Sequence, residues 1–170
     1  MTDWREKVRT IPGFPEPGVV FRDILPVLAD PDAYRAMLDE LGRAATRFAP
    51  SVIVAPEARA FLLAAPLADR LGAGVVAVRK PGKLPGPVLG EEYVLEYGVG
   101  RLEMSADLAL DGRRALIVDD VLATGGTVAA TARLIRRAGA EVAGALFLIE
   151  LVQLGGRERA DVEAVALWSL

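Results

Sequence analysis

The chain has 170 residues, 52% of them hydrophobic and 25% charged, a length that suits one domain with a substantial core. It contains no cysteine and no histidine, which excludes disulfides, thiol nucleophiles, Ser-His-Asp mechanisms and His- or Cys-ligated metals. Its 20 Lys and Arg residues and 23 Asp and Glu residues give a net charge of -3, which argues against bulk binding to nucleic acid. Catalysis is left to carboxylates, lysine, arginine, hydroxyls, backbone amides and an oxygen-ligated ion such as magnesium.

The sequence shows no apolar segment of membrane-spanning length. Its N-terminus is charged from the third residue, and the longest apolar runs, such as 60–68, are far shorter than a membrane span. We therefore expect a soluble, cytoplasmic protein that binds no membrane.

The N-terminal region combines a proline-rich run with the start of a helix. The run Ile11-Pro-Gly-Phe-Pro-Glu-Pro-Gly18 cannot be helical, because each proline restricts its own backbone and that of the residue before it. It leads into the extended residues 19–21, so we expect an irregular arm. From Asp30, apolar residues recur at helical spacing as far as Phe48, which predicts an amphipathic helix.

Strands and helices alternate through the rest of the chain. Apolar residues at helical spacing predict helices at 61–71 and 127–138, and short apolar runs predict strands at 51–55, 75–78, 115–118, 142–149 and 165–168. Two further runs flank Gly98-Val-Gly100 and predict an antiparallel ribbon, 93–97 with 101–104. The alternation predicts the α/β class: a mostly parallel twisted sheet flanked by helices, from which residues 80–104 project as a flexible flap.

The strongest local signal runs from Leu116 to Thr127, Leu-Ile-Val-Asp-Asp-Val-Leu-Ala-Thr-Gly-Gly-Thr. Here a buried strand gives way to a predicted loop at 119–126 and then to a helix, which is where α/β sheets bind ligands. Backbone N–H groups and hydroxyls of residues 124–127 can bind a phosphate monoester at the helix N-terminus, and a valine at Gly125 is expected to fill space that the phosphate needs. Asp119 and Asp120 would accept hydrogen bonds from sugar hydroxyls beside the phosphate. The alternative is a threonine-capped surface turn with solvated aspartates.

Two other kinds of phosphate-binding loop do not fit. The chain has no G-x-x-x-x-G-K-[ST] run, which excludes a Walker-type nucleotidase. Gly72-Ala-Gly74 begins a formal match to the dinucleotide fingerprint, but it falls between a helix and a strand, the reverse of the required order. We interpret it as a helix C-cap and a strand entry.

A second candidate site consists of cations. Arg79, Lys80 and Lys83 follow a predicted strand in a stretch that holds four glycine or proline residues. They would converge on the 124–127 region and bind a second, more highly charged phosphate group, and Arg59 at the preceding strand-to-helix junction would add a guanidinium fork. The alternatives are a solvated basic loop and an ordinary helix start.

Over almost its whole length, the chain resembles the adenine phosphoribosyltransferases, which have the type I phosphoribosyltransferase fold. The 117–127 pattern is shared by the superfamily, whereas three other runs point to the adenine enzymes: Ile11–Ile24, Val78–Gly86 and Glu91–Gly98. The resemblance implies a purine salvage enzyme that transfers the phosphoribosyl group from phosphoribosyl pyrophosphate (PRPP) to adenine, giving AMP and pyrophosphate. It also implies one domain over 1–170, a homodimer, and a magnesium ion held mainly by PRPP rather than by side chains.

The resemblance also implies roles for particular residues. The ribose phosphate part of PRPP would be bound by Asp119, Asp120, Ala123, Thr124, Gly125, Gly126 and Thr127. Pyrophosphate would be bound by Lys80, Lys83 and Arg59, the last also catalytic, while Arg79 would reach a neighbouring subunit's site. Residues 1–29 would form a hood over adenine, with contacts from Val20, Phe21, Arg22 and, outside the hood, Leu122. Glu96 on the flap would handle the purine proton.

One stretch departs from the family pattern. Where the family usually has G-x-x-[AS]-R-G-F, this chain has Ala55-Pro-Glu-Ala-Arg-Ala60-Phe61. A methyl group at Ala60 and a proline at Pro56 bear on how closely the backbone can approach pyrophosphate. Two alternatives therefore stay open: a transferase for another nucleobase, and a non-catalytic PRPP-sensing regulator, for which this acidic chain has no basic arm.

Overall fold

The computed structural model describes residues 2–95 and 98–170. They fall into two compact units, Met1–Glu40 and Leu41–Leu170. Helix α2 (Pro31–Thr46) crosses the boundary between the two units. Within the described part, no helix is both long enough and apolar enough to span a bilayer.

The first unit is not the irregular arm that the prolines predict. It contains η1 (Trp4–Lys7), β1 (Arg9–Pro12), β2 (Val20–Asp23) and the short helix α1 (Leu25–Ala29). Strands β1 and β2 pair antiparallel, and the proline-rich run forms the connection between them, closed by a hydrogen bond of 2.7 Å from the N–H of Gly13 to the carbonyl of Val19. The extended conformation predicted for 19–21 is confirmed at Val20 and Phe21. The prediction of an irregular arm is wrong where β1 and β2 pair, because the strands gain their order from each other rather than from local sequence.

The first unit is held together by a buried tryptophan and a carboxylate. Trp4 is 1% exposed, and its indole N–H donates to Glu40 at 2.8 Å. Arg5 stacks over the same indole ring, 4.5 Å from its centroid, and pairs with Glu40 at 2.6 Å. Glu40 thus ties η1 to α2 through three charge-assisted hydrogen bonds, one from Trp4 and two from Arg5.

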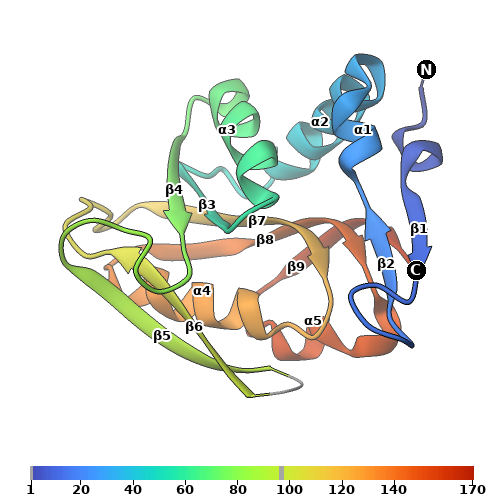
Figure 1. Cartoon of the computed structure of the whole chain (residues 1–170). Coiled ribbons are helices and arrows are strands. Elements are labelled where there is room, and N and C mark those ends of the chain that lie inside the picture. Colours follow the sequence, from blue (N-terminus) through green and yellow to red (C-terminus); the bar gives the residue numbers. More distant parts are fainter. Residues whose placement is uncertain (1, 96–97) are drawn as a thin grey trace. The chain divides into compact units, whose positions relative to one another are not determined.

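The second unit is built on a parallel sheet of five strands, in the order β4-β3-β7-β8-β9. The strands are β3 (Val52–Pro56), β4 (Gly74–Val78), β7 (Arg114–Leu122), β8 (Glu141–Glu150) and β9 (Ala164–Ser169). Helix α3 (Ala60–Leu71) covers one face and α4 (Gly126–Arg137) the other (Figure 1). The predicted α/β class and mostly parallel sheet are confirmed, and Gly72 is the predicted left-handed C-cap of α3.

The sheet reverses its winding between β3 and β7. From β3 the chain moves outward to β4, whereas from β7 it moves through β8 to β9 in the other direction. At such a switch point, neighbouring strands send their following helices to opposite faces and leave a crevice at their carboxyl ends. The segments after β3 and after β7 therefore meet at one edge of the sheet.

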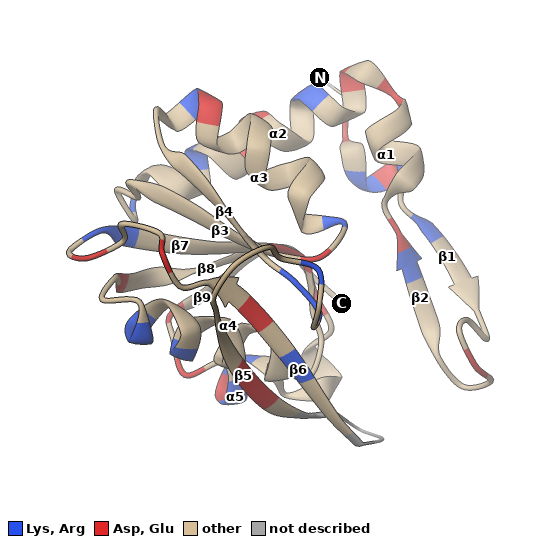
Figure 2. Ribbon diagram, turned by 60° about the vertical axis from the view of Figure 1, so that its left-hand side comes forward, with Lys and Arg blue, Asp and Glu red and all other residues tan. Residues whose placement is uncertain are grey.

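The ribbon formed by β5 (Val88–Leu95) and β6 (Gly98–Ser105) is longer than predicted, and its base belongs to the core. Gly100 lies within β6 rather than in a turn, where it pairs with Tyr93. A Cβ there would lie 2.7 Å from the Tyr93 ring, so the position has no room for a side chain. Leu102 and Met104 are buried, and Arg133 of α4 pairs with Glu91 at 2.5 Å. Strand β5 carries acidic positions, whereas β6 carries a basic and an acidic one (Figure 2).

Three short elements that no sequence pattern predicts complete the chain. They are η1, described above, η2 (Val152–Leu154) and α5 (Gly156–Arg159). Such elements span about one turn, so their residues show no helical periodicity.

Ala60, where the family usually has glycine, lies in ordinary helical backbone. Ala60 opens α3, is fully buried and follows Arg59, whose backbone is right-handed helical (φ -64°). We predict that Ala60→Gly lowers the free energy of unfolding by about 0.5–1 kcal/mol, because glycine is a poor helix former, and leaves the affinity for PRPP unchanged. Chemical denaturation and calorimetric titration test this, with Ala65→Gly, at an exposed position of the same helix, as the matched control. A tenfold gain in PRPP affinity on Ala60→Gly would show that the methyl group obstructs the site.

Candidate functional site

Strand β7 carries both adjacent aspartates and extends further than the sequence predicts. The predicted loop at 119–126 is wrong for its first residues, because β7 continues to Leu122 and the loop is confined to 123–125. The reason is long-range pairing: Asp119 lies opposite Phe147 and Leu122 opposite Glu150 on β8. Successive residues of a strand point to opposite faces. Asp120 is buried (5% exposed), whereas Asp119 is partly exposed and its Oδ1 accepts a hydrogen bond of 2.8 Å from the backbone N–H of Asp120.

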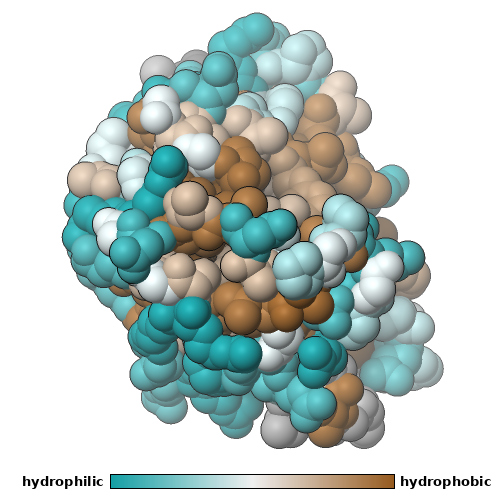
Figure 3. Space-filling model, turned by 90° about the vertical axis from the view of Figure 1, so that its left-hand side faces the viewer, coloured by the Kyte–Doolittle hydropathy of each residue, from teal (hydrophilic) through white to brown (hydrophobic). Residues whose placement is uncertain are grey.

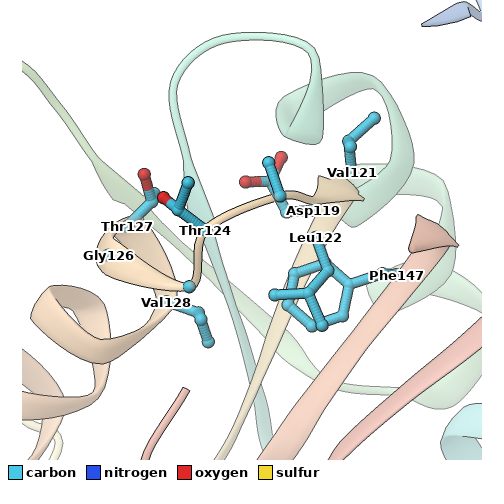
Figure 4. A pocket seen from close by; sticks show the side chains of 10 residues that line it. Asp119, Val121, Leu122, Thr124, Gly126, Thr127, Val128 and Phe147 are labelled. Carbon is cyan, nitrogen blue, oxygen red and sulfur yellow. The ribbon is translucent and has the colours of Figure 1, made fainter. Parts of the chain in front are cut away.

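A small pocket lies where β7 ends and α4 begins (Figure 4). It is lined by Asp119, residues 121–128 and Phe147. The oxygen-bearing side chains of Thr124, Thr127 and Asp119 gather on one side of the chain, and the apolar side chains of Leu122 and Phe147 lie on the other (Figure 4). All the residues predicted to bind ribose phosphate except Asp120 thus line one pocket. Phe147 was not predicted to line it, because its apolar strand gives no sign of a pocket.

The start of α4 is suited to an anion. Its N-cap residue, Gly125, has a left-handed backbone (φ 84°) and no side chain with which to cap the first turn. The first N–H groups of a helix have no partner within the helix, and the positive end of its dipole adds to their attraction for a phosphate. Gly125 and Gly126 both line the pocket, so this end of the helix opens into it.

The pKa of the Asp119 carboxyl is raised in the folded protein. Burial, followed by the neighbouring Asp120 carboxylate, raises the pKa of Asp119 well above its ordinary value, while Arg59 acts in the opposite direction. A ligand hydroxyl that donates to this carboxylate stabilises the ionised form. Ligand binding at Asp119 is therefore coupled to the release of a proton.

Arg59 joins the neighbouring strand to the pair of aspartates. It lies at the N-cap of α3, directly after the β3 end, and its Nε is 2.5 Å from Oδ2 of the buried Asp120. The Arg59 side chain is still 37% exposed, so part of it faces solvent at this edge of the sheet. The guanidinium of Arg59, predicted to bind pyrophosphate, is therefore paired with Asp120, one of the two carboxylates predicted to bind ribose.

The cationic segment after β4 is held in place by two glutamates. Glu57 accepts hydrogen bonds from Arg79 Nε at 2.7 Å and from the backbone N–H of Lys80 at 3.0 Å, and the Arg79 side chain hydrogen bond holds the pKa of Glu57 below its ordinary value. Glu103 of β6 is buried and accepts from the N–H of Gly82 at 3.0 Å. Its backbone also pairs in both directions with that of Arg79, at 2.8 and 2.7 Å.

The cationic side chains of this segment differ in their pairing and exposure. Arg79, predicted to reach a neighbouring subunit, pairs with Glu57 and lies 5.7 Å from the centroid of the Phe61 ring. Lys80 and Lys83 are both exposed. Glu103 was not predicted to take part, because its buried position on a ribbon cannot be read from a single charged residue among apolar ones.

The residues predicted to contact adenine fall in different places. Val20, Phe21 and Arg22 belong to β2 in the first unit, where Val20 is 46% exposed and the Phe21 ring packs edge-on against Phe14, with centroids 5.1 Å apart. Leu122 is 1% exposed and forms part of the pocket wall in the second unit. Glu96 lies outside the described residues.

Comparison with known proteins agrees with this geometry. Residues 32–166 match the phosphoribosyl transferase domain. The adenine phosphoribosyltransferase of Desulfitobacterium hafniense is 54% identical over 94% of this chain and 92% of its own length. The adenine phosphoribosyltransferase of Streptomyces coelicolor is also 54% identical, over 91% of this chain and 85% of its own.

Solved structures are similar over the same extent. The crystal structure of adenine phosphoribosyltransferase from Thermoanaerobacter pseudethanolicus shares 47% identity and superimposes with a TM-score of 0.94, covering 97% of this chain and 96% of its own. The enzyme from Saccharomyces cerevisiae, complexed with an imino-altritol bisphosphate and adenine, shares 34% identity with a TM-score of 0.91, covering 96% of both chains. The chain therefore belongs to the phosphoribosyl transferase domain family, in its group of adenine phosphoribosyltransferases.

Proposed function

We propose that this chain transfers the phosphoribosyl group of PRPP to adenine, giving AMP and pyrophosphate in purine salvage. The observation that carries the proposal is the single pocket in which an uncapped helix N-terminus and the Asp119 carboxylate lie together. A phosphate fits the first and sugar hydroxyls fit the second. The choice of adenine is supported by the names of relatives that match more than nine-tenths of the chain.

In the proposed complex, the ribose phosphate occupies the Figure 4 pocket. The backbone N–H groups of residues 123–127 and the hydroxyls of Thr124 and Thr127 bind the phosphate. Asp119 accepts hydrogen bonds from the ribose hydroxyls, and Asp120 contributes through its pair with Arg59. This arrangement fixes the sugar before pyrophosphate departs, which is how a bound geometry lowers a barrier.

The leaving pyrophosphate is proposed to face Arg59, Lys80 and Lys83. Its departure develops negative charge on the diphosphate and positive charge on the sugar, so fixed cations favour the transition state. The exposed guanidinium of Arg59 and the two exposed lysines supply that charge from the adjacent ends of β3 and β4. Glu57 and Glu103 hold the backbone of the lysine-bearing segment in place.

The adenine-binding residues are proposed from the family resemblance. Val20, Phe21 and Arg22 of the hood would contact the base, with Leu122 at the pocket wall. Glu96 on the flap would handle the purine proton, since a carboxylic acid in a water-poor site can act as a general acid or base.

Magnesium is proposed to arrive with PRPP. The ion prefers hard oxygen ligands and keeps an octahedral shell largely filled by phosphates and water. Asp119 offers one such oxygen in the pocket, and among the residues the structure describes no three acidic side chains gather into a cage of their own. When bound, the ion would neutralise charge on the diphosphate.

A homodimer and a cytoplasmic location complete the proposal. Leu62 on α3 and Val75 on the edge strand β4 are 50% and 46% exposed, and hydrophobic surface is visible from the side of β4 and the ribbon (Figure 3). Such a face suits contact with a second copy of the chain. Arg79 would then part from Glu57 and reach the site of that second copy. The location follows from the substrate, because PRPP is a polyanion that does not cross a lipid bilayer.

Turnover with a panel of bases tests the proposed function. With PRPP and magnesium, we expect rapid AMP formation from adenine, and far slower product formation from hypoxanthine, guanine, xanthine or orotate. Chromatographic separation of the nucleotides measures each product. Preference for another base would replace adenine, and PRPP binding without any product would indicate a sensor.

The pKa of Asp119 gives a second prediction. Because the free carboxyl has a raised pKa and ribose hydroxyls favour its ionised form, PRPP affinity should rise as pH increases through that raised pKa. Asp119→Asn should remove this part of the slope and weaken binding by about 1–3 kcal/mol, the scale of a hydrogen bond to a charged group. Calorimetric titration across a pH series measures both effects.

The control separates Asp119 from the ligand's own ionisation. The phosphate monoester of PRPP loses its second proton at a pKa of about 6, so Asp119→Asn keeps that contribution to the slope. Asp107→Asn, at an exposed position outside the pocket, should retain both the wild-type slope and the wild-type affinity. Identical pH profiles for the wild type and Asp119→Asn would contradict the assignment of ribose to Asp119.

A further inference from the structure

Two glycines from separate segments lie back to back behind the loop at 123–125. A Cβ at Gly125 would lie 2.4 Å from the carbonyl oxygen of Gly156. A Cβ at Gly156 would lie 2.1 Å from the carbonyl oxygen of Ala123 and 3.1 Å from the backbone nitrogen of Gly125. The two distances to carbonyl oxygens, 2.4 and 2.1 Å, are far below van der Waals contact, so the two backbones pack together with no room for a side chain between them.

This contact corrects an expectation from the sequence. A valine at Gly125 was expected to fill space that the phosphate needs, but the Cβ of residue 125 would point at Gly156, Arg159 and Ala160 instead. Thr124 and Thr127 line the pocket (Figure 4), whereas Gly156, Arg159 and Ala160 are not among its lining residues. Gly125 is therefore required for contact with the segment behind the loop.

Gly156 is followed by Arg157, which pairs with a buried carboxylate. Glu150 ends β8 and is 5% exposed, and Arg157 Nε donates to its Oε1 at 3.0 Å. A second guanidinium nitrogen contacts Oε2 of the same carboxylate, and a third contact reaches the carbonyl of Ala164 on β9. Three contacts from one planar group hold the residue after Gly156 against two strands of the sheet.

The segment that follows β8 and the loop at 123–125 are also linked through the sheet. The N–H of Leu151 donates to the carbonyl of Leu122 at 2.9 Å, directly before the loop begins. The loop at 123–125 is thus bounded by β7 on one side, by α4 on the other, and by Gly156 behind. A rigid backing of this kind matters for a site made of backbone N–H groups, because their direction follows the backbone.

We propose that Gly156, held by the Glu150–Arg157 ion pair, is a positioning residue for PRPP: it sets the place of the 123–125 loop and so aims the N–H groups at the start of α4. The inference rests on the proposed function of that loop. Its effect should appear in PRPP binding, because the atoms nearest to a Cβ at Gly156 belong to Ala123 and Gly125 of that loop.

The test compares a Gly156 variant with a matched control. Gly156→Ala adds one methyl group that must displace Ala123, and we expect the KM for PRPP to rise at least tenfold while the KM for adenine changes less than twofold. Gly42→Ala makes the same change where nothing lies within 4 Å, and should behave as the wild type. Thermal unfolding followed by circular dichroism shows that each variant is folded.

A second pair of variants keeps the test decisive if Gly156→Ala does not fold. Arg157→Met should raise the KM for PRPP severalfold, and Arg157→Lys, which keeps the charge, should recover part of the loss. A KM for PRPP within twofold of wild type in the folded Gly156→Ala and Arg157→Met variants would overturn the inference, as would a fall in kcat alone. Failure of the wild-type chain to use PRPP at all would instead overturn the proposed function.

Discussion

Parallel pairing of β3 with β7, at the point where the sheet reverses its winding, is the constraint on which the site depends. It brings the end of β3, with Arg59, beside the end of β7, with its two aspartates and the loop before α4. Because the two strands are parallel, both carboxyl ends open at the same edge. Residues some 60 positions apart in sequence thereby come together at one edge of the sheet, where Arg59 pairs with Asp120.

The charges at this edge are held in pairs before any ligand arrives. Arg59 pairs with Asp120, and Arg79 pairs with Glu57. In each pair the two opposite charges compensate each other, so no unpaired charge has to be accommodated in a partly buried position. A polyanion such as PRPP then competes with carboxylates for guanidinium groups that are already oriented, whereas the exposed Lys80 and Lys83 add attraction without such competition.

Much of this arrangement could be predicted from the sequence because it is local. The alternation of strands and helices, the Gly72 cap and the Thr-Gly-Gly-Thr helix start are each written within a few residues. What could not be predicted depends on distant partners: β7 runs through Asp119 because β8 pairs with it, and β1 exists because β2 lies opposite. The need for glycine at 125 likewise comes from Gly156, and no local pattern reports that contact.

The central claim is that the first turn of α4 binds the phosphate of PRPP, and backbone amide NMR tests it most directly. Ribose 5-phosphate, added to the isotope-labelled full chain, carries that phosphate without the pyrophosphate. The account predicts that the largest shifts among backbone amides fall within residues 123–128, with Asp119 and Asp120 next. Unchanged amides at 123–128, with the largest shifts elsewhere in the chain, would contradict it.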